Sequence, residues 1–306
     1  MFIRFRNATL GTRILHPLLC ILFSRNKKLP PLNSPPGMRY LVNGPPKSGT
    51  HLAKKILGLT GLQQHPFTLA AYHADQAIHT WDARQEKLLG PMIEIGMQPK
   101  PIHDLLLRQS LRSIPPANVF NGHCTHTPAL VQLLKEEQIR VVSVIRDPRD
   151  IVVSLAEYLK KHNHPSYQNL SWNKCLRQAI LGYSAVHVTK VAALEERNWG
   201  QVWEAFLPWV EEKQVLTLRF EDLIGPEGGG SGKVQLENLE AILAFLDKEA
   251  LPASEIQKKI FGGTRTFNVG DIGRWKEKFT KDNKALFKQV IGNLLVKLDY
   301  EADDDW

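Results

Sequence analysis

Residues 44–55 read Gly-Pro-Pro-Lys-Ser-Gly-Thr-His-Leu-Ala-Lys-Lys, directly after a strand-like apolar run and directly before a helical pattern. Gly49 and the short side chains of Ser48 and Thr50 allow several backbone N–H groups to converge on one anion. Lys47 adds a full positive charge to the same loop. This order of strand, loop and helix predicts a phosphate-binding loop at the carboxyl end of a strand.

The position of the lysine narrows the choice of ligand. A P-loop that hydrolyses ATP or GTP has the order G-x-x-x-x-G-K-[ST], with the lysine after the last glycine. Here Lys47 precedes Gly49. The loop therefore predicts a phosphorylated nucleotide as the ligand but disfavours the NTP hydrolases.

Apolar, β-branched runs at 39–42, 140–145 and 215–220 are typical of buried parallel strands, and each is followed by loop residues and a helix. Helical periodicity is visible over 172–194 and 236–246. The pattern predicts an α/β fold with a P-loop-type central parallel sheet, flanked by helices on both faces, in a single domain. A chain of 306 residues is long enough to bury such a core.

The charge of the chain is distributed unevenly. The net charge is +8, yet no Asp or Glu precedes Asp75, while ten Lys or Arg do. The rest of the chain is close to neutral. A nucleic-acid binder more often carries its basic excess as a stripe on the folded body. We therefore expect no nucleic-acid partner.

The termini are predicted to differ from the body of the chain. We expect a basic leader and Pro-rich linker over 1–37, a folded domain over 38–300 and an acidic tail over 301–306. The apolar run 14–23 has only ten residues, about half of what a helix needs to span a bilayer. We expect a cytoplasmic protein. Organellar or secretory targeting by the leader, its cleavage and a weak membrane association through it are left open.

The cysteines and histidines do not predict a disulfide framework or a metal site. Cys20, Cys124 and Cys175 are odd in number and lack C-x-x-C spacing, so reduced thiols are expected. His123 and His126 have no second Cys/His cluster that would complete four ligands. We predict no bound metal.

Two further segments are predicted to be irregular. Residues 68–117 lack clear periodicity, and we expect either a cover over the site or a surface excursion without a role in binding. The glycine-rich stretch 227–233 is expected to form a surface loop.

A second anion signature follows the predicted strand that ends at residue 145. Residues 146–154 read Arg-Asp-Pro-Arg-Asp-Ile-Val-Val-Ser. Asp147 is a good N-cap and Pro148 suits the first helical position, so a helix is expected to begin here. Arg146 can bind a phosphate with two parallel hydrogen bonds, and Ser154 adds a hydroxyl two turns later. Lys47 is expected at the same edge of the sheet, because ligands bind beyond the carboxyl ends of parallel strands.

Together these blocks resemble the sulfotransferases that use 3′-phosphoadenosine 5′-phosphosulfate (PAPS). Residues 46–50, Pro-Lys-Ser-Gly-Thr, match the family's loop for the 5′-phosphosulfate. Arg146 and Ser154 match its 3′-phosphate site in residue type and in spacing. Residues 270–280 partly match the carboxy-terminal block R-K-G-x-x-G-D-W-K-x-x-F-T. The resemblance covers roughly 38–290 and implies a sulfotransferase-like domain with PAPS as its co-substrate.

The resemblance also implies a set of nucleotide-binding residues, which are Lys47, Ser48, Gly49, Thr50, His51, Arg146, Ser154, Phe220, Arg265 and Gly270. Several positions depart from the family pattern. Asn268 and Val269 stand where the family has Arg-Lys, and Arg265 is the nearby candidate to replace that charge. Arg274 replaces the usual Asp, Leu52 stands in place of a tryptophan, and Phe220 in place of a tyrosine.

Sulfuryl transfer needs a base for the proton of the acceptor and a cation for the leaving oxygen. Lys47 is predicted to stabilise the charge that grows on the bridging oxygen. The family's base lies in a K-T-H or G-H motif some twenty-odd residues before the arginine of the 3′-phosphate site. His123, in Asn121-Gly122-His123, occupies that place. His126 is three residues further on and is kept as the alternative.

We therefore expect a PAPS-dependent sulfotransferase that modifies a hydroxyl or amine of a small molecule, lipid or glycan by in-line displacement. Two rivals remain. One is a P-loop nucleotide kinase, which the order of Lys47 and Gly49 disfavours. The other is a non-catalytic nucleotide-binding or membrane-recruitment module, which Asn268, Val269 and the basic leader favour. The sequence leaves the oligomeric state open.

Overall fold

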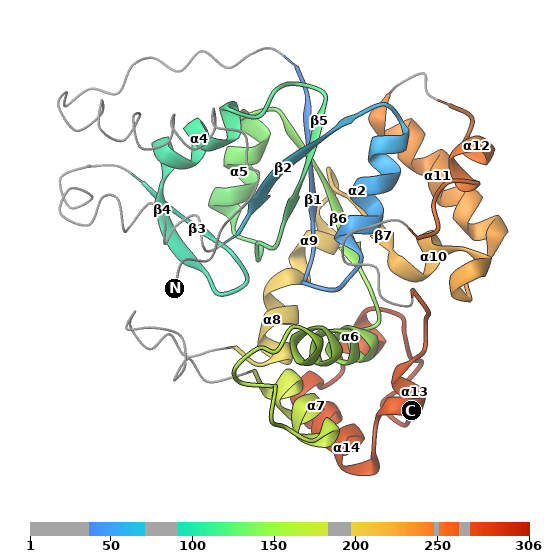
Figure 1. The fold of residues 1–306 in the computed structure, drawn as a ribbon. Helices are drawn as coiled ribbons and strands as arrows, with labels where there is room; N and C mark the ends of the chain where they lie inside the picture. Colours follow the sequence, from blue (N-terminus) through green and yellow to red (C-terminus); the bar gives the residue numbers. More distant parts are fainter. Residues whose placement is uncertain (1–36, 71–90, 183–196, 248–250, 263–269) are drawn as a thin grey trace, which may run out of the picture.

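The computed structural model describes residues 37–70, 91–182, 197–247, 251–262 and 270–306 (Figure 1). Five parallel strands form the central sheet, with the order β2-β5-β1-β6-β7. A short antiparallel pair, β3-β4, lies outside it. The predicted parallel sheet with helices on both faces is confirmed.

The strands of the main sheet end in one row. Their bounds are β1 Arg39–Asn43, β2 Gln63–Leu69, β5 Asn118–Gly122, β6 Ile139–Ile145 and β7 Leu216–Arg219; those of the small pair are β3 Met92–Ile95 and β4 Lys100–His103. Asn43, the last residue of β1, is paired with Gly122 of β5 on one side and Ser143 of β6 on the other. The loops that follow β1 and β5 therefore begin side by side, and the loop after β6 begins two residues further along, after Ile145.

Helices cover both faces of this sheet. Their bounds are α2 Thr50–Leu59, α4 Asp104–Arg112, α5 Pro128–Glu136, α6 Pro148–Lys161, α7 Trp172–Leu181, α8 Trp199–Phe206, α9 Pro208–Glu211, α10 Phe220–Ile224, α11 Gly232–Leu246, α12 Ala253–Gln257, α13 Trp275–Lys278, α14 Lys281–Ile291 and α15 Leu294–Lys297. In Figure 1, α2, α10, α11 and α12 gather on one side of the sheet and α4 and α5 on the other. Helices α6, α7, α8 and α14 lie together beyond the carboxyl ends of the strands.

Two hydrophobic cores explain why the strands are apolar throughout. Tyr40 and Val42 of β1 pack into one core with α2, α10 and α11, whereas Leu41 between them packs into the other core with α4, α5 and α8. Successive side chains of a strand point to opposite faces, so both parities must be apolar when both faces are covered. All three side chains are at most 3% exposed.

Two strands of the sheet were not predicted. Strand β5 reads Asn-Val-Phe-Asn-Gly and has only two large apolar residues, yet all five are buried. Strand β2 contains Pro66, and its pairing with β5 shifts register between Gln64 and Thr68. Both lack the continuous apolar run by which buried strands are recognised. The sheet forms around them because α2 and β1 supply the apolar neighbours.

Other boundaries differ from the prediction. The strand expected over 215–220 ends at Arg219, because Phe220 begins helix α10, whose first turn is acidic. Part of the segment 68–117, expected to be irregular, forms β3, β4 and α4. The glycine-rich stretch 227–233 overlaps a 3-10 turn at Pro226–Gly228 and the first turn of α11.

Some predictions fall on residues outside the described part of the chain. These are the leader and linker up to residue 36, the end of the periodicity over 172–194, and Arg265, Asn268 and Val269. Within the described ranges, no helix is long and apolar enough to cross a bilayer. Cys124 and Cys175 are free, buried thiols, as predicted.

Candidate active site

The predicted phosphate loop lies between β1 and α2, where strand and helix meet at the row of strand ends. The backbone of Lys47 has a φ of 72° and that of Gly49 a φ of 105°. These two reversals fold the loop back on itself, and the Ser48 N–H donates to the carbonyl of Pro45 at 3.2 Å. Such alternation turns successive N–H groups toward one side, where the first turn of α2 adds its own free donors.

Two glycines are needed because the loop is closely packed from below. A Cβ on Gly44 would lie 2.4 Å from the carbonyl oxygen of Val144, on the neighbouring strand. A Cβ on Gly49 would lie 2.6 Å from the ring of Phe220. The loop is thereby pressed against β6 and the start of α10. This packing restricts the shape of the loop.

Lys47 is the cation of this loop, and its ammonium group has a defined resting place. The Nζ atom lies 4.3 Å from the centre of the Tyr158 ring, in cation–π contact. Burial, and next the positive charge of Arg146, lower the pKa of Lys47 to about 8, while Glu157 opposes this shift. Lys47 therefore remains mostly charged at neutral pH but loses its charge two to three units earlier than an exposed lysine.

Arg146 lies beside the loop, as the strand order predicts, and is only 7% exposed. Its Nη1 donates to the carbonyl of Lys47 at 3.4 Å, and its Nη2 donates to the carbonyl of Asp271 at 3.0 Å. The guanidinium lies 4.1 Å from the centre of the Phe220 ring. Arg146 thus joins the phosphate loop to the carboxy-terminal block, with an aromatic ring against its plane.

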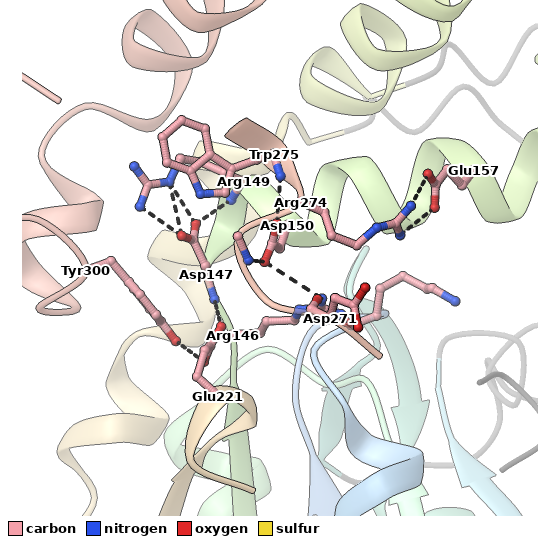
Figure 2. Close-up of polar contacts among 12 residues, drawn as sticks. Arg146, Asp147, Arg149, Asp150, Glu157, Glu221, Asp271, Arg274, Trp275 and Tyr300 are labelled. Atoms are coloured by element: carbon pink, nitrogen blue, oxygen red, sulfur yellow. Dashed lines mark hydrogen bonds and ion pairs between the residues drawn. The ribbon is translucent and has the colours of Figure 1, made fainter. Parts of the chain in front are cut away.

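Helix α6 begins directly after this arginine, and its predicted cap is confirmed. Asp147 accepts a hydrogen bond from the N–H of Arg149 at 2.9 Å, and Pro148 occupies the first turn. Glu221 accepts from the N–H of Asp147 at 2.9 Å and from the hydroxyl of Tyr300 at 3.0 Å. Figure 2 shows these contacts converging from three separate parts of the chain.

The carboxy-terminal block is attached to the same turn of α6. Asp150 accepts from the N–H groups of Gly273 at 2.7 Å and Trp275 at 3.0 Å. Arg274 donates two hydrogen bonds to Glu157, at 2.6 and 2.8 Å. Burial raises the pKa of Asp150, and Arg146 opposes this. The segment around 270–280 therefore lies next to Arg146, as its resemblance to the carboxy-terminal motif of the family implies.

His123 follows β5 and lies next to the phosphate loop. Its Nδ1 is 2.8 Å from the carbonyl oxygen of Gly44, which can only accept, so the Nδ1 carries the proton of the neutral ring. The Nε2 is then left with its lone pair. Burial lowers the pKa of His123 below its usual value, with the Gly44 contact opposing. At neutral pH the imidazole is uncharged, as a general base requires.

Asn43, at the end of β1, fixes the backbone around this histidine. Its side-chain amide donates to the carbonyl of Cys124 at 2.9 Å and accepts from the N–H of Cys124 at 2.9 Å. The N–H of His123 donates to the carbonyl of Leu69 at 3.0 Å. His123 is therefore held by the ends of β1 and β2 as well as by the contact of its own ring.

His126 has different surroundings. Its Nε2 lies 2.9 Å from a carboxylate oxygen of Glu212, and its ring contacts Trp209 edge to face. Its N–H donates to the carbonyl of Ala205 at 2.8 Å. These partners belong to α8, α9 and the segment after them. The geometry therefore favours His123 over His126 as the group next to the phosphate loop.

The other predicted residues within the described ranges have the following surroundings. Thr50 is buried in the first turn of α2, and the Nδ1 of His51 lies 3.4 Å from the amide nitrogen of Asn121. Ser154 is half-buried on α6, and Gly270 is the first described residue of the carboxy-terminal block. Phe220 is buried, with its ring against Arg146 and Gly49.

Sequence reasoning did not identify Glu157, Tyr158 or Glu221. Tyr158 is four residues after Ser154, and Glu157 is three residues after it, so both share its face of α6. That spacing was a usable signal. Glu221 had none, because its partner Asp147 is 74 residues away in the sequence.

The site contains polar atoms that suit an anionic ligand. Ser48 Oγ and Arg146 Nε are buried and have no hydrogen-bond partner among the described residues. Such atoms are uncommon in native proteins and often indicate a missing ligand or water. With Lys47, they fit a nucleotide with phosphates at two positions. The described residues hold no cluster of three or more His, Cys, Asp or Glu side chains arranged for a metal ion.

A separate groove of about 490 Å³ lies at the other end of the sheet. It is lined by residues at the start of β6 and before β7, among them Ile139, Val215 and Trp209. Both anion signatures are at the carboxyl ends of the strands. The groove is therefore distinct from the candidate active site.

Comparisons with known proteins agree with this geometry. The model of the family described as "Sulfotransferase domain" matches residues 38–299. Among curated proteins, "Cytosolic sulfotransferase 12" of Arabidopsis thaliana is 24% identical over 246 residues, which cover 77% of this chain and 71% of that protein.

Solved structures share the fold. The mouse sulfotransferase SULT7A1 complexed with PAP superposes with a TM-score of 0.54 at 16% identity, over 88% of this chain and 89% of the other. A retinol dehydratase in complex with androsterone and inactive cofactor PAP gives a TM-score of 0.50 at 14% identity, over 86% and 82% of the two chains.

Proposed function

The chain belongs to the sulfotransferase family, whose domain model matches most of its length, and on that premise we propose how its residues transfer a sulfuryl group from PAPS. The acceptor is a hydroxyl or amine of a small molecule, lipid or glycan. The observation that carries this proposal is the pairing of His123 with the phosphate loop, through the carbonyl of Gly44 at 2.8 Å. It places an uncharged imidazole against the loop that carries Lys47.

PAPS supplies an activated sulfuryl group together with adenosine 3′,5′-bisphosphate as its leaving group. In the transfer, a bond forms between sulfur and the acceptor atom, and the bond from sulfur to the bridging phosphate oxygen breaks. The Nε2 of His123 takes the proton of the acceptor. Lys47 and the N–H groups of the loop stabilise the charge left on the bridging oxygen. Base catalysis of this kind contributes about a hundredfold to ten-thousandfold.

The two phosphates of the nucleotide are assigned to different elements. Ser48, Gly49 and Thr50 hold the 5′ side with the loop and the first turn of α2. Arg146 and Ser154 hold the 3′-phosphate at the start of α6. The support for this division is that Arg146 already bonds to the carbonyl of Lys47, so both subsites are parts of one hydrogen-bonded unit.

The first test is calorimetric titration of the purified protein with adenosine 3′,5′-bisphosphate, ATP and AMP in parallel. We expect clear preference for the bisphosphate. Transfer is then measured with ³⁵S-labelled PAPS and a panel of phenols, steroid and terpenoid alcohols, amines and simple glycans. A steroid alcohol belongs in the panel because the related fold of retinol dehydratase was solved with androsterone.

Each rival predicts a different outcome. Preference for ATP over the bisphosphate would favour a nucleotide kinase. Normal binding of the bisphosphate, with no transfer to any acceptor of the panel, would favour a non-catalytic nucleotide-binding module. Loss of transfer in His123→Ala, with bisphosphate binding retained, would support the assignment of the base.

A further inference from the structure

Arg274 is in an unusual place for a cation. It stands at the N-cap of α13, where the sequence pattern of similar proteins has an aspartate. An arginine has no acceptor atom, so it cannot cap the helix, and no side-chain cap is formed. Its guanidinium instead reaches across to α6 and forms the two-bonded pair with Glu157.

This pair lies next to the proposed phosphate subsites (Figure 2). Glu157 directly precedes Tyr158, and the Nζ atom of Lys47 lies 4.3 Å from the centre of the Tyr158 ring. It is also three residues after Ser154, about one helical turn on the same face of α6. The positive charge of Arg274 acts on Arg146, and the negative charge of Glu157 acts on Lys47. Arg274 is thus within electrostatic reach of the 3′ side of the site.

The pair is also open to exchange. The side chains of Arg274 and Glu157 are 20% and 19% exposed, unlike the Arg149–Asp147 pair, in which Arg149 is 3% exposed. Ion pairs that water can reach contribute little to stability. A phosphate dianion offers a guanidinium more charge and more acceptor oxygens than one carboxylate does. An incoming phosphate can therefore compete with Glu157 for Arg274.

The sequence before Arg274 lacks two cations that similar proteins have at this block. Positions 268 and 269 are Asn and Val, so this part of the carboxy-terminal block carries no charge for a phosphate. Five residues later, Arg274 adds a cation to the same block. The N–H groups of Gly273 and Trp275 donate hydrogen bonds to Asp150 and so fix the backbone on both sides of Arg274.

We propose that Arg274 determines the preference for a 3′-phosphorylated nucleotide, by binding the 3′-phosphate together with Arg146 and Ser154, while Glu157 holds it in place before the nucleotide arrives. This assignment rests on the proposed function. It names a cation, in addition to the candidate Arg265, that supplies charge in place of the residues missing at 268 and 269.

The test compares adenosine 3′,5′-bisphosphate with AMP, which lacks only the 3′-phosphate, by calorimetry. Arg274→Ala is expected to weaken bisphosphate binding on the order of tenfold and to leave AMP binding unchanged. Lys278→Ala removes the same charge from the same block, but Lys278 lies over Trp172 of α7. It is the matched control and is expected to leave the ratio of the two affinities unchanged.

Glu157→Gln separates a ligand contact from a structural one. If Arg274 binds the phosphate, removing its resting partner leaves bisphosphate binding intact or tighter. If Arg274 only ties the block to α6, Glu157→Gln weakens binding as Arg274→Ala does, and the proposal is wrong. Should Arg274→Ala fail to fold, Arg274→Gln is read in the same way, with circular dichroism as the check on folding.

Two further outcomes are decisive. Equal loss of bisphosphate and AMP binding in Arg274→Ala would overturn the assignment, because the residue would not distinguish the 3′-phosphate. A wild-type protein without any preference for the bisphosphate would instead overturn the proposed function itself. The wild-type titration therefore separates the two failures.

Discussion

The tautomer of the neutral His123 ring is set by one backbone oxygen. Because the Gly44 carbonyl can only accept, the proton stays on Nδ1 and the lone pair on Nε2. The sequence motif located this residue but left His126 as an alternative. It could not show that His126 is taken up by Glu212, because that contact joins residues 86 positions apart.

His123→Ala is expected to lower kcat by about a hundredfold to ten-thousandfold, because the acceptor loses its base. Binding of adenosine 3′,5′-bisphosphate should stay within about twofold, since Lys47 and Arg146 are untouched. Single-turnover transfer and calorimetry measure the two quantities. His126→Ala is the control and should retain transfer; the reverse pattern would move the base to His126.

The pH dependence of kcat/KM is expected to be bell-shaped. His123 must be neutral, and burial lowers its pKa, so the acid limb falls below pH 6.5. Lys47 must be charged, and its pKa of about 8 places the alkaline limb there, with activity lost as pH rises. Lys47→Arg keeps the charge at any working pH. In that variant the alkaline limb should disappear, and its persistence near pH 8 would assign it to another group.

The loop between β1 and α2 was the part of the site best predicted from the sequence. Its glycines and lysine act through the backbone of a few consecutive residues, which is what a sequence motif can encode. Packing beneath the loop could not be predicted. The contact between Gly49 and Phe220 joins residues that are 171 positions apart, so only the fold reveals it.

Gly49→Ala is expected to lower nucleotide affinity at least tenfold, because the new methyl would lie 2.6 Å from the Phe220 ring and would displace the loop. The positive φ adds a strain of about 1–3 kcal/mol to the folded state. Gly61→Ala is the matched control, since its φ is +92° and a Cβ there has no atom within 4 Å. Urea denaturation should show a loss of stability in both variants, larger in Gly49→Ala because only that methyl overlaps a neighbour, and calorimetry should show a loss of binding only in Gly49→Ala.

An unchanged affinity in Gly49→Ala would mean that the loop tolerates displacement and does not form the rigid cradle described above.

The strands beside this loop show where sequence reasoning was weakest. His123 directly follows strand β5. The two asparagines and the final glycine of this strand are not typical of a buried strand, so its sequence did not predict it. It was missed because its burial comes from its neighbours in the sheet and not from its own composition.

Across the whole molecule, the carboxy-terminal segment closes over the start of α6. Arg149 contacts Asp147 and Glu301 and lies against the rings of Trp275 and Trp306, so both ends of the acidic segment 301–306 pack on the domain. The sequence predicted a tail there from charge alone. Charge does not reveal that Trp306 contacts two aromatic rings, Trp275 and Phe287, and three cations, Arg149, Lys284 and Lys288.

Asp150→Ala is expected to lower the free energy of unfolding by about 2–3 kcal/mol, because two part-buried N–H groups lose the charged acceptor that holds them. Adenosine 3′,5′-bisphosphate should restore part of this stability, since it binds only the folded state. Urea denaturation with and without the nucleotide measures both effects. Asp304→Ala, at an exposed position, is the control and should change stability by a few tenths of a kcal/mol. Equal effects of the two substitutions would remove Asp150 from this role.

The carbonyl of Gly44 has a consequence for how such an enzyme can change over time. It belongs to the phosphate loop, yet it contacts His123, the group proposed to serve the acceptor. A new acceptor can be accommodated by altering residues elsewhere around the site without retuning the base. A new donor nucleotide that requires a different loop would also reorient the imidazole. Under this proposal, acceptor specificity can change by substitution at other positions, whereas donor specificity is constrained by the carbonyl oxygen of Gly44.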